Sequence, residues 1–391
     1  MCCKISLRYV LQFAAALCLA SSVSVHTAAG SVGPAVVAKA DYHLWPGRLD
    51  TAGGFDRASR AAILEYSLAL QEMGELSDAD MLAAFHIRSV DRASVKKWLG
   101  KERKLLLLNY RLASEDCADG DWTCTGNVPA FEDLLQKARK TSLGMPRNLV
   151  AWRDNFDGFA RTYVAEQLRL AALFPKVSSE IELFGDDELN GDALDDRKFF
   201  LTFDDGPTAV GGLTESTLGM LRDSNKSAVF FVLGTRLQDR LDKSSAAALV
   251  ALYKNQCVGS HGWKHKSHAK WDKWQESIKR TEVLLKTTLP PDVVVPLFRP
   301  PYGQRRDDSG VFFRAQSLRV ALWNLDSQDW NHHVDADDVV NRMIELMLIK
   351  RHGVLLFHDV HPKARVALPA IFKALGNAVE WEDCHSLAAM Q

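Results

Sequence analysis

Two adjacent carboxylates, Asp204 and Asp205, follow a short apolar run at residues 199–203. The run is typical of a buried strand, and Gly206 and Pro207 after the pair are typical of a turn. Ordinary turn chemistry is one explanation, because Asp and Gly are frequent where a strand ends. The other explanation is functional, because two carboxylates that face one water-poor pocket repel each other unless a cation lies between them. The pair therefore indicates either a turn or a cation site.

Two histidines four residues apart, His261 and His265, could bind a metal ion. On a helical turn this spacing places both imidazoles on one side, which is a common arrangement of metal ligands. It is not the H-E-x-x-H pattern of metalloproteases, because Gly262 stands where the glutamate would be. His268 could replace one of the two, and a polar loop without a metal is the alternative for the pair. We expect His261 and His265 as ligands, with His268 outside the coordination shell.

A third ligand would explain the carboxylate pair. If Asp205 joins the two histidines, the charge of the metal ion offsets the repulsion, and Asp204 is free to act as a base. Three protein ligands leave one coordination position open for water, as catalytic zinc sites do. Bound metal lowers the pKa of that water and polarises a carbonyl group. The pattern therefore predicts metal-assisted hydrolysis.

The elements that must position these residues are short apolar strands that alternate with helices. Segments with strand character lie at residues 199–203, 227–234, 256–260, 293–301, 319–325 and 352–359. Segments with helical character lie between them, at residues 214–224, 244–253, 274–287 and 336–349. Such alternation predicts parallel strands covered by helices, with polar strand ends that converge on one face of a barrel. The residues that this arrangement brings together are Asp204, Asp205, His261, Arg299, Asp326 and His358.

The region before these strands has helical periodicity. Apolar positions recur with helical spacing from about residue 56 to residue 174 and predict a bundle of helices. Residues 185–197 then carry six acidic residues, which favours a solvated linker; a calcium loop is the alternative, although the Asp spacing does not match one. We expect an all-α helical domain at residues 30–185, an acidic linker at 186–197 and a catalytic α/β domain at 198–391.

Residues 1–29 have the pattern of a signal peptide. Lys4 and Arg8 precede an apolar stretch that is too short to span a bilayer comfortably, and small residues follow it. An uncleaved anchor is the alternative. No second apolar span follows in the sequence, so we expect an exported mature chain, periplasmic or secreted, without a transmembrane segment.

Four cysteines remain after removal of the signal peptide, namely Cys117, Cys124, Cys257 and Cys384. An even number in an exported chain indicates disulfides. The short polar loop between the first two favours Cys117–Cys124, which leaves Cys257–Cys384 as the long-range pair. Four cysteines permit three pairings, and free thiols are the alternative.

The composition is that of an ordinary globular protein. Of the 391 residues, 47% are hydrophobic and 25% are charged, and the net charge is −1 at pH 7. This balance gives no indication of a nucleic-acid partner or of an anionic membrane surface.

Five motifs in order make the sequence resemble the polysaccharide deacetylases with the NodB homology domain, carbohydrate esterase family four. The motifs are TFDDGP at 202–207, HGWKH at 261–265, RPPYG at 299–303, DSQDW at 326–330 and LFH at 356–358. The resemblance covers residues 198–376 and does not extend to the helical region. Gly262 departs from the family pattern, which has Ser or Thr there, and the departure is expected to loosen the metal loop without removing a ligand.

The resemblance implies a distorted (β/α) barrel and the metal-dependent removal of an N-acetyl group. It implies Zn2+, or another divalent transition metal, held by Asp205, His261 and His265. The catalytic residues that it implies are the base Asp204, the orienting Arg299, the acid His358 and its partner Asp329. The substrate-binding residues that it implies are Tyr302 through its backbone N–H, and Trp330 and Leu356 around the acetyl methyl group. Asp326 is expected to support its loop.

These roles lead to one hypothesis for the function and to two alternatives. The chain is expected to deacetylate N-acetylglucosamine residues of an extracytoplasmic polysaccharide. The export signal favours peptidoglycan over chitin-like or poly-N-acetylglucosamine polymers. One alternative is an O-acetyl esterase that acts on a xylan-type polysaccharide. The other is an inactive barrel that only binds glycan, which the joint presence of base, ligands and acid disfavours.

Overall fold

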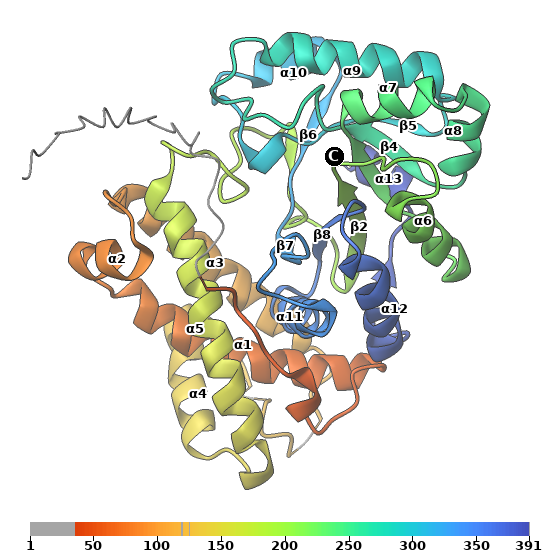
Figure 1. The fold of residues 1–391 in the computed structure, drawn as a ribbon. Coiled ribbons are helices and arrows are strands. Elements are labelled where there is room, and N and C mark those ends of the chain that lie inside the picture. Colours follow the sequence, from red (N-terminus) through yellow and green to blue (C-terminus); the bar gives the residue numbers. More distant parts are fainter. Residues whose placement is uncertain (1–35, 119, 125, 391) are drawn as a thin grey trace, which may run out of the picture. The chain divides into compact units, whose positions relative to one another are not determined.

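The sheet that carries the polar strand ends consists, within the described residues, of nine parallel strands (Figure 1). The computed structural model describes residues 36–118, 120–124 and 126–390, so the predicted signal peptide at 1–29 lies outside the described residues. The strands are β1 (Glu188–Leu189), β2 (Lys198–Asp204), β3 (Val229–Val232), β4 (Cys257–Ser260), β5 (Val294–Phe298), β6 (Arg319–Ala321), β7 (Leu325–Asp326), β8 (Gly353–His358) and β9 (Glu380–Trp381). Their order in the sheet is β1-β6-β5-β4-β3-β2-β8-β7, and β9 pairs with β2.

Helices connect many of the strands and cover the sheet (Figure 1). They are α6 (Leu213–Asp223), α7 (Gly234–Asp242), α8 (Ala246–Leu252), α9 (Trp274–Thr288), α10 (Gly310–Ala315), α11 (Ala336–Lys350), α12 (Lys363–Leu375) and α13 (Cys384–Ala389). Parallel neighbours need such crossovers, which is why strand and helical segments alternate in the sequence. The expected distorted (β/α) barrel is confirmed. In the described part of the chain it is open between β1 and β7, which end the sheet.

The parallel register brings the strand ends to one level. Asp204 at the end of β2 is opposite Phe231 of β3 and His358 of β8. Successive strand residues point to opposite faces, so Asp204 shares its face with Thr202 and Phe200. That face encloses a small apolar cluster, whereas the other face packs on the covering helices. The inward-facing positions are therefore mostly apolar along the strands and polar at their carboxyl ends.

The predicted helical region is confirmed, and five α-helices precede the sheet in the described residues. They are α1 (Ala52–Gly74), α2 (Asp78–Phe85), α3 (Arg92–Ala113), α4 (Phe131–Leu143) and α5 (Val150–Leu173), with short 3-10 helices at Tyr42–Leu44, Arg147–Leu149 and, later in the chain, Pro301–Gly303. Ser77 and Asp91 cap α2 and α3, because each side chain accepts a hydrogen bond from the first turn. None of the described helices has both the length and the apolar character that a membrane span requires.

Helix α11 and the residue after it, Arg351, join this helical region to the sheet through buried ion pairs. They are Arg342–Glu166 at 2.7 Å, Lys350–Glu102 at 2.6 Å and Arg351–Asp56 at 2.8 Å. Removal of one partner would leave an uncompensated buried charge, so these pairs fix how the helices sit on the sheet. One apolar core also continues from the helical region to the outer face of the sheet.

The acidic segment at residues 186–197 is part of the fold. Its residues Glu188 and Leu189 form β1, which pairs with β6. Glu188 is 9% exposed and accepts a hydrogen bond from Arg305, and Asp196 accepts one from Arg351. The expectation of a solvated linker is therefore wrong, because arginines distant in the sequence neutralise these acids. The division of the chain into two domains at this segment stays a prediction.

Both expected disulfides, Cys117–Cys124 and Cys257–Cys384, are present. The second joins the start of β4 to the start of α13, and its partners are 127 residues apart in the sequence. Leu387 of α13 packs into the apolar cluster inside the barrel. The disulfide therefore attaches the last helix to the strand that leads to His261.

Loss of the long-range disulfide is expected to destabilise the fold more than loss of the local one. A cross-link restricts the unfolded chain, and its effect grows with the length of the closed loop. The variant Cys257→Ser/Cys384→Ser should lose about 5 kcal/mol of unfolding free energy, and Cys117→Ser/Cys124→Ser about 2 kcal/mol. Urea unfolding of the two variants measures the difference. An equal or larger loss in the local variant would contradict the expectation.

Candidate active site

Asp204 and Asp205 end strand β2 in different surroundings. Asp204 is 3% exposed and accepts a hydrogen bond of 3.0 Å from Nη1 of Arg299. Successive strand residues point to opposite faces, so Asp205 reaches the same site only because its backbone leaves the strand, with φ at 79°. Its Oδ1 lies 3.5 Å from Nε2 of His261 and 3.5 Å from Nε2 of His265. That oxygen is buried and has no hydrogen-bond partner among the described residues.

Asp205, His261 and His265 form a set of donors suited to a metal ion. One ligand atom from each lies within 4.8 Å of the others. Nδ1 of His261 donates to the carbonyl oxygen of Arg299 at 2.7 Å, which leaves its Nε2 free to bind. Burial lowers the pKa of His265 to about 4, so its ring is neutral and able to act as a ligand at neutral pH. Two imidazoles and a carboxylate with an unpartnered buried oxygen fit Zn2+ or a similar ion.

His268 does not belong to this set. Its Nδ1 donates to the carbonyl oxygen of Lys266 at 2.9 Å, and its Nε2 lies 3.1 Å from Oγ of Ser277. The buried ring fills the space beside Gly262, where an added Cβ would lie 2.7 Å from Cε1 of His268. Gly262 also has φ at 78°, a value that favours glycine. The departure from Ser or Thr at this position therefore has a steric reason in this chain.

Arg299 is fully buried, and all three nitrogens of its guanidinium donate hydrogen bonds. Nε donates to the carbonyl oxygen of Ala321 at 2.9 Å, and Nη2 to that of Leu322 at 2.9 Å. Nη1 donates to Oγ1 of Thr202 at 2.6 Å and to Oδ1 of Asp204 at 3.0 Å. The orientation of the Asp204 carboxylate is therefore set by a residue that follows β5 and is itself held by the end of β6.

His358 ends β8 and is held by Asp329. Its Nδ1 donates to Oδ1 of Asp329 at 2.7 Å, and its backbone N–H donates to Oδ2 at 2.9 Å. Burial disfavours the charged ring, but the charge and hydrogen bond of Asp329 outweigh this effect and raise the pKa of His358 to about 10. The ring is therefore protonated at neutral pH and able to donate a proton. Asp326, on the same loop, accepts two hydrogen bonds from Gln328, which agrees with support of that loop.

These groups line a cleft of about 250 Å³. Tyr302 and Trp330 are each 37% exposed along it, and Leu356 is 3% exposed. Arg299 and Asp329, both fully buried, lie behind its surface. The structure thus brings together all the residues predicted for metal binding, acid–base chemistry and substrate binding, while their individual roles stay predictions.

The cleft has a wall that sequence reasoning missed. It consists of Glu166, Gln167, Arg169 and Leu170 of α5 and of Val177, Ser179 and Glu180 after that helix. No motif marks these residues, and helical periodicity shows which face of a helix is buried but not what borders that face. The signal that could have been used is the charge of Glu166 and Arg169 within an otherwise apolar helix face.

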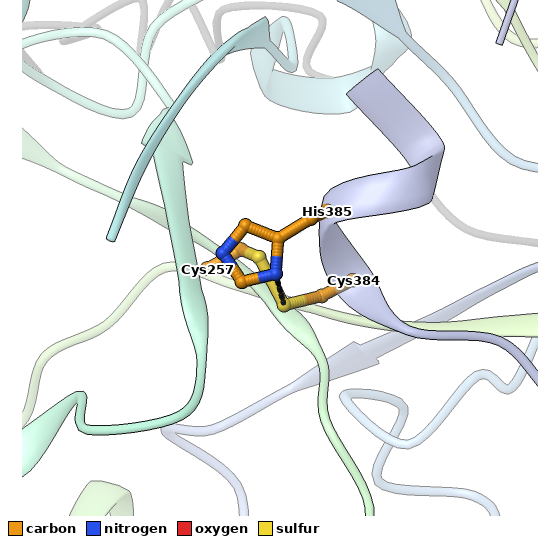
Figure 2. A group of neighbouring side chains, drawn as sticks. All are labelled: Cys257, Cys384 and His385. Atoms are coloured by element: carbon orange, nitrogen blue, oxygen red, sulfur yellow. Dashed lines mark hydrogen bonds between the residues drawn. A yellow bond between two sulfur atoms is a disulfide. The ribbon is translucent and has the colours of Figure 1, made fainter. Parts of the chain in front are cut away.

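A second group of potential ligands, Cys257, Cys384 and His385, is not a metal centre. Figure 2 shows the two sulfur atoms bonded to each other, with the His385 ring beside them. Nδ1 of His385 lies 3.8 Å from Sγ of Cys384. Disulfide sulfurs are not thiolates and do not bind metal ions as cysteine ligands do. Within the described residues, the set around Asp205 is therefore the candidate metal site.

Comparison with known families finds a match that covers part of the site, while Asp329 and His358 lie outside it. Residues 191–320 match the family model described as Polysaccharide deacetylase. This region contains the carboxylate pair, the two histidines and Arg299, whereas the helical region lies outside it.

Several relatives of this chain are named as deacetylases. A peptidoglycan-N-acetylglucosamine deacetylase of Bacillus cereus is 29% identical over 230 residues, which are 56% of this chain and 79% of the relative. A bifunctional xylanase/xylan deacetylase of Cellvibrio japonicus is 30% identical over 162 residues, 41% of this chain and 22% of the relative. Among solved structures, peptidoglycan deacetylase PdaC from Bacillus subtilis is 25% identical with a TM-score of 0.40, covering 50% of this chain and 91% of that structure.

The ligand set predicts different behaviour of two neighbouring histidines. His265→Ala removes one of three ligands and should lose most of the bound metal after loading with Zn2+ and dialysis. His268→Ala keeps the ligands and should retain the metal, with lower thermal stability because a buried ring is lost. Metal analysis and thermal unfolding of both variants check this. Loss of metal in His268→Ala with retention in His265→Ala would show that the assignment is wrong.

Proposed function

Because this chain belongs to the polysaccharide deacetylase family, we propose that it removes N-acetyl groups from N-acetylglucosamine residues of an extracytoplasmic polysaccharide, above all peptidoglycan. The observation that carries this proposal is the cleft in which a buried base candidate, three ligand candidates and a protonated histidine lie together. The name of the Bacillus cereus relative supports peptidoglycan as the polymer. The signal peptide expected at residues 1–29 supports the location.

We assign the metal to Asp205, His261 and His265, with Zn2+ or another divalent transition metal as the ion. When bound, such an ion polarises a carbonyl group and lowers the pKa of a water molecule beside it. Three ligands from the protein would leave room for water and substrate at an ion held there. An ion held there would also give Oδ1 of Asp205 a partner, since this buried oxygen has no hydrogen bond among the described residues.

Asp204 is the base of the proposed reaction. Its carboxylate takes a proton from the water molecule that attacks the amide carbonyl carbon. Arg299 engages Oδ1 of Asp204 and leaves Oδ2 on the side of His261, 3.8 Å from its Nε2. The carboxylate is therefore oriented toward the side where the metal ligands lie.

His358 is the acid that completes the reaction. It gives a proton to the amine nitrogen as the carbon–nitrogen bond breaks, which is required because an amide anion is a poor leaving group. Asp329 keeps the ring charged and fixes its orientation. The backbone N–H of Tyr302 is assigned to the oxygen on which negative charge develops. Trp330 and Leu356 are assigned to the acetyl methyl group, since both line the cleft.

An O-acetyl esterase that acts on a xylan-type polymer is the second candidate function. The name of the Cellvibrio japonicus relative, a bifunctional xylanase/xylan deacetylase, favours it. The same base and metal ligands would serve an ester, whose alcohol leaves more readily than an amine. An inactive glycan-binding barrel is disfavoured, because the base, ligand and acid candidates are all present in one cleft.

The role of His358 predicts a change in the pH profile. Activity needs the protonated ring and is lost as the pH rises through its pKa. Asp329→Asn removes the charge that raises this pKa, so the alkaline limb of kcat should move to lower pH by roughly 1–3 units. A pH series on a chitooligosaccharide measures the shift, and metal content is the control. An unchanged alkaline limb in a metal-loaded variant would remove His358 from the role of acid.

The proposed function is tested by acetate release from three polymers. Purified peptidoglycan, chitooligosaccharides and acetylated xylan are each incubated with the enzyme, with and without a chelator, and again after Zn2+ is restored. Release from the first two is expected, with loss on chelation and recovery with metal. Release from acetylated xylan alone would favour the esterase. No release from any polymer by the metal-loaded enzyme would overturn both proposed activities, the N-deacetylase and the O-acetyl esterase.

A further inference from the structure

Helix α5 borders the substrate cleft although it lies outside residues 191–320, the region that matches the family model. Glu166, Arg169 and Leu170 all line the cleft. Their spacing of three and four residues places them on one face of the helix. The helical region therefore contributes side chains to the place where the glycan must bind.

This wall is held in position by buried charges. Glu166 accepts hydrogen bonds of 2.7 and 3.1 Å from Arg342 of α11. After the end of α5, Arg305 donates to the carbonyl oxygen of Ser179 at 2.8 Å and to that of Gly303 at 3.1 Å. The helix is thus attached to α11 and the segment after it to Arg305, which fixes the place of Arg169.

Arg169 has no anionic partner within the described part of the chain. Its side chain is half-buried, and no hydrogen bond or ion pair of the guanidinium is present among the described residues. Burial lowers the pKa of Arg169, and no nearby acid offsets the effect. Arg161, about two turns earlier on the same helix, instead pairs with Glu72 and Asp157. Among the residues that the structure describes, Arg169 is therefore a partly desolvated cation without a counter-charge.

The acids in the cleft do not supply that counter-charge. Glu166 is engaged by Arg342. Burial, together with the charge of Asp326, raises the pKa of Glu180 to about 7, and burial raises the pKa of Asp326. A half-buried guanidinium that lacks an anion is suited to bind one from a ligand, because its planar donors match a carboxylate.

We infer that Arg169 binds a carboxylate of the glycan substrate, so that the cleft selects acidic N-acetylglucosamine polymers over neutral ones. The inference rests on the proposed deacetylase function, since the acetylated glycan must occupy the same cleft. In peptidoglycan the carboxylate has two chemical sources, the lactyl group of muramic acid residues and the stem peptides.

The test compares acidic with neutral substrates for the full mature protein. The constant kcat/KM for acetate release is measured on glycan strands freed of stem peptides, on strands that retain them, and on neutral chitopentaose. In Arg169→Gln the ratio of the acidic to the neutral value should fall by about 10- to 100-fold. The strand type with the larger fall identifies the source of the carboxylate. Arg161→Gln is the matched control on the same helix and should leave the ratio unchanged.

An unchanged ratio in Arg169→Gln, or an equal fall in Arg161→Gln, would overturn the inference. Binding of the same three glycans, followed by tryptophan fluorescence, tests it without turnover. If the protein releases no acetate from any of them, the deacetylase proposal fails. In that case weaker binding of the acidic strands by Arg169→Gln would still support a carboxylate site, and equal binding by both variants would overturn it.

Discussion

The buried guanidinium of Arg299 is the interaction on which the rest of the site depends. It donates to Asp204 at the end of β2 and to the carbonyl oxygens of Ala321 and Leu322 at the end of β6, while its own backbone follows β5. A guanidinium carries five donors in a rigid plane and keeps its charge, which suits a position without solvent. Without it, Asp204 would lose the cation that pairs with it directly, and the strand ends would lose their common anchor.

Each carboxylate of the centre has a different source of compensation. Asp204 has Arg299, and Asp329 has His358. Asp205 faces two histidines, and one of these, His265, is neutral at physiological pH. The charge that remains on Asp205 is therefore compensated best by an ion that the two imidazoles bind with it. This difference explains how two adjacent aspartates can have different roles, one as base and one as ligand. The residue type is the same, but the groups around each carboxylate differ.

The sequence by itself determined which residues meet at the mouth of the barrel. Parallel strands bring their carboxyl ends to one edge, so polar residues that follow apolar runs can be located without knowledge of side-chain positions. This argument identified Asp204, His261, Arg299 and His358, and the structure places them together around one cleft. The helical region and both disulfides could also be predicted, since helical periodicity and a short loop between cysteines are local properties of the chain.

Only the tertiary structure decided which distant groups these residues meet. The composition of the acidic segment around Glu188 indicates exposure to solvent. In the structure, Glu188 is buried and pairs with Arg305, which is distant in the sequence. Spacing favoured His265 over His268 as a ligand but could not show what His268 does instead, which is to pack beside Gly262 and Ser277. The sequence could not show that α5 borders the cleft, for the same reason. Helical periodicity shows that one face of a helix is buried. It does not show which segment packs against that face, because contacts between segments distant in the sequence decide this.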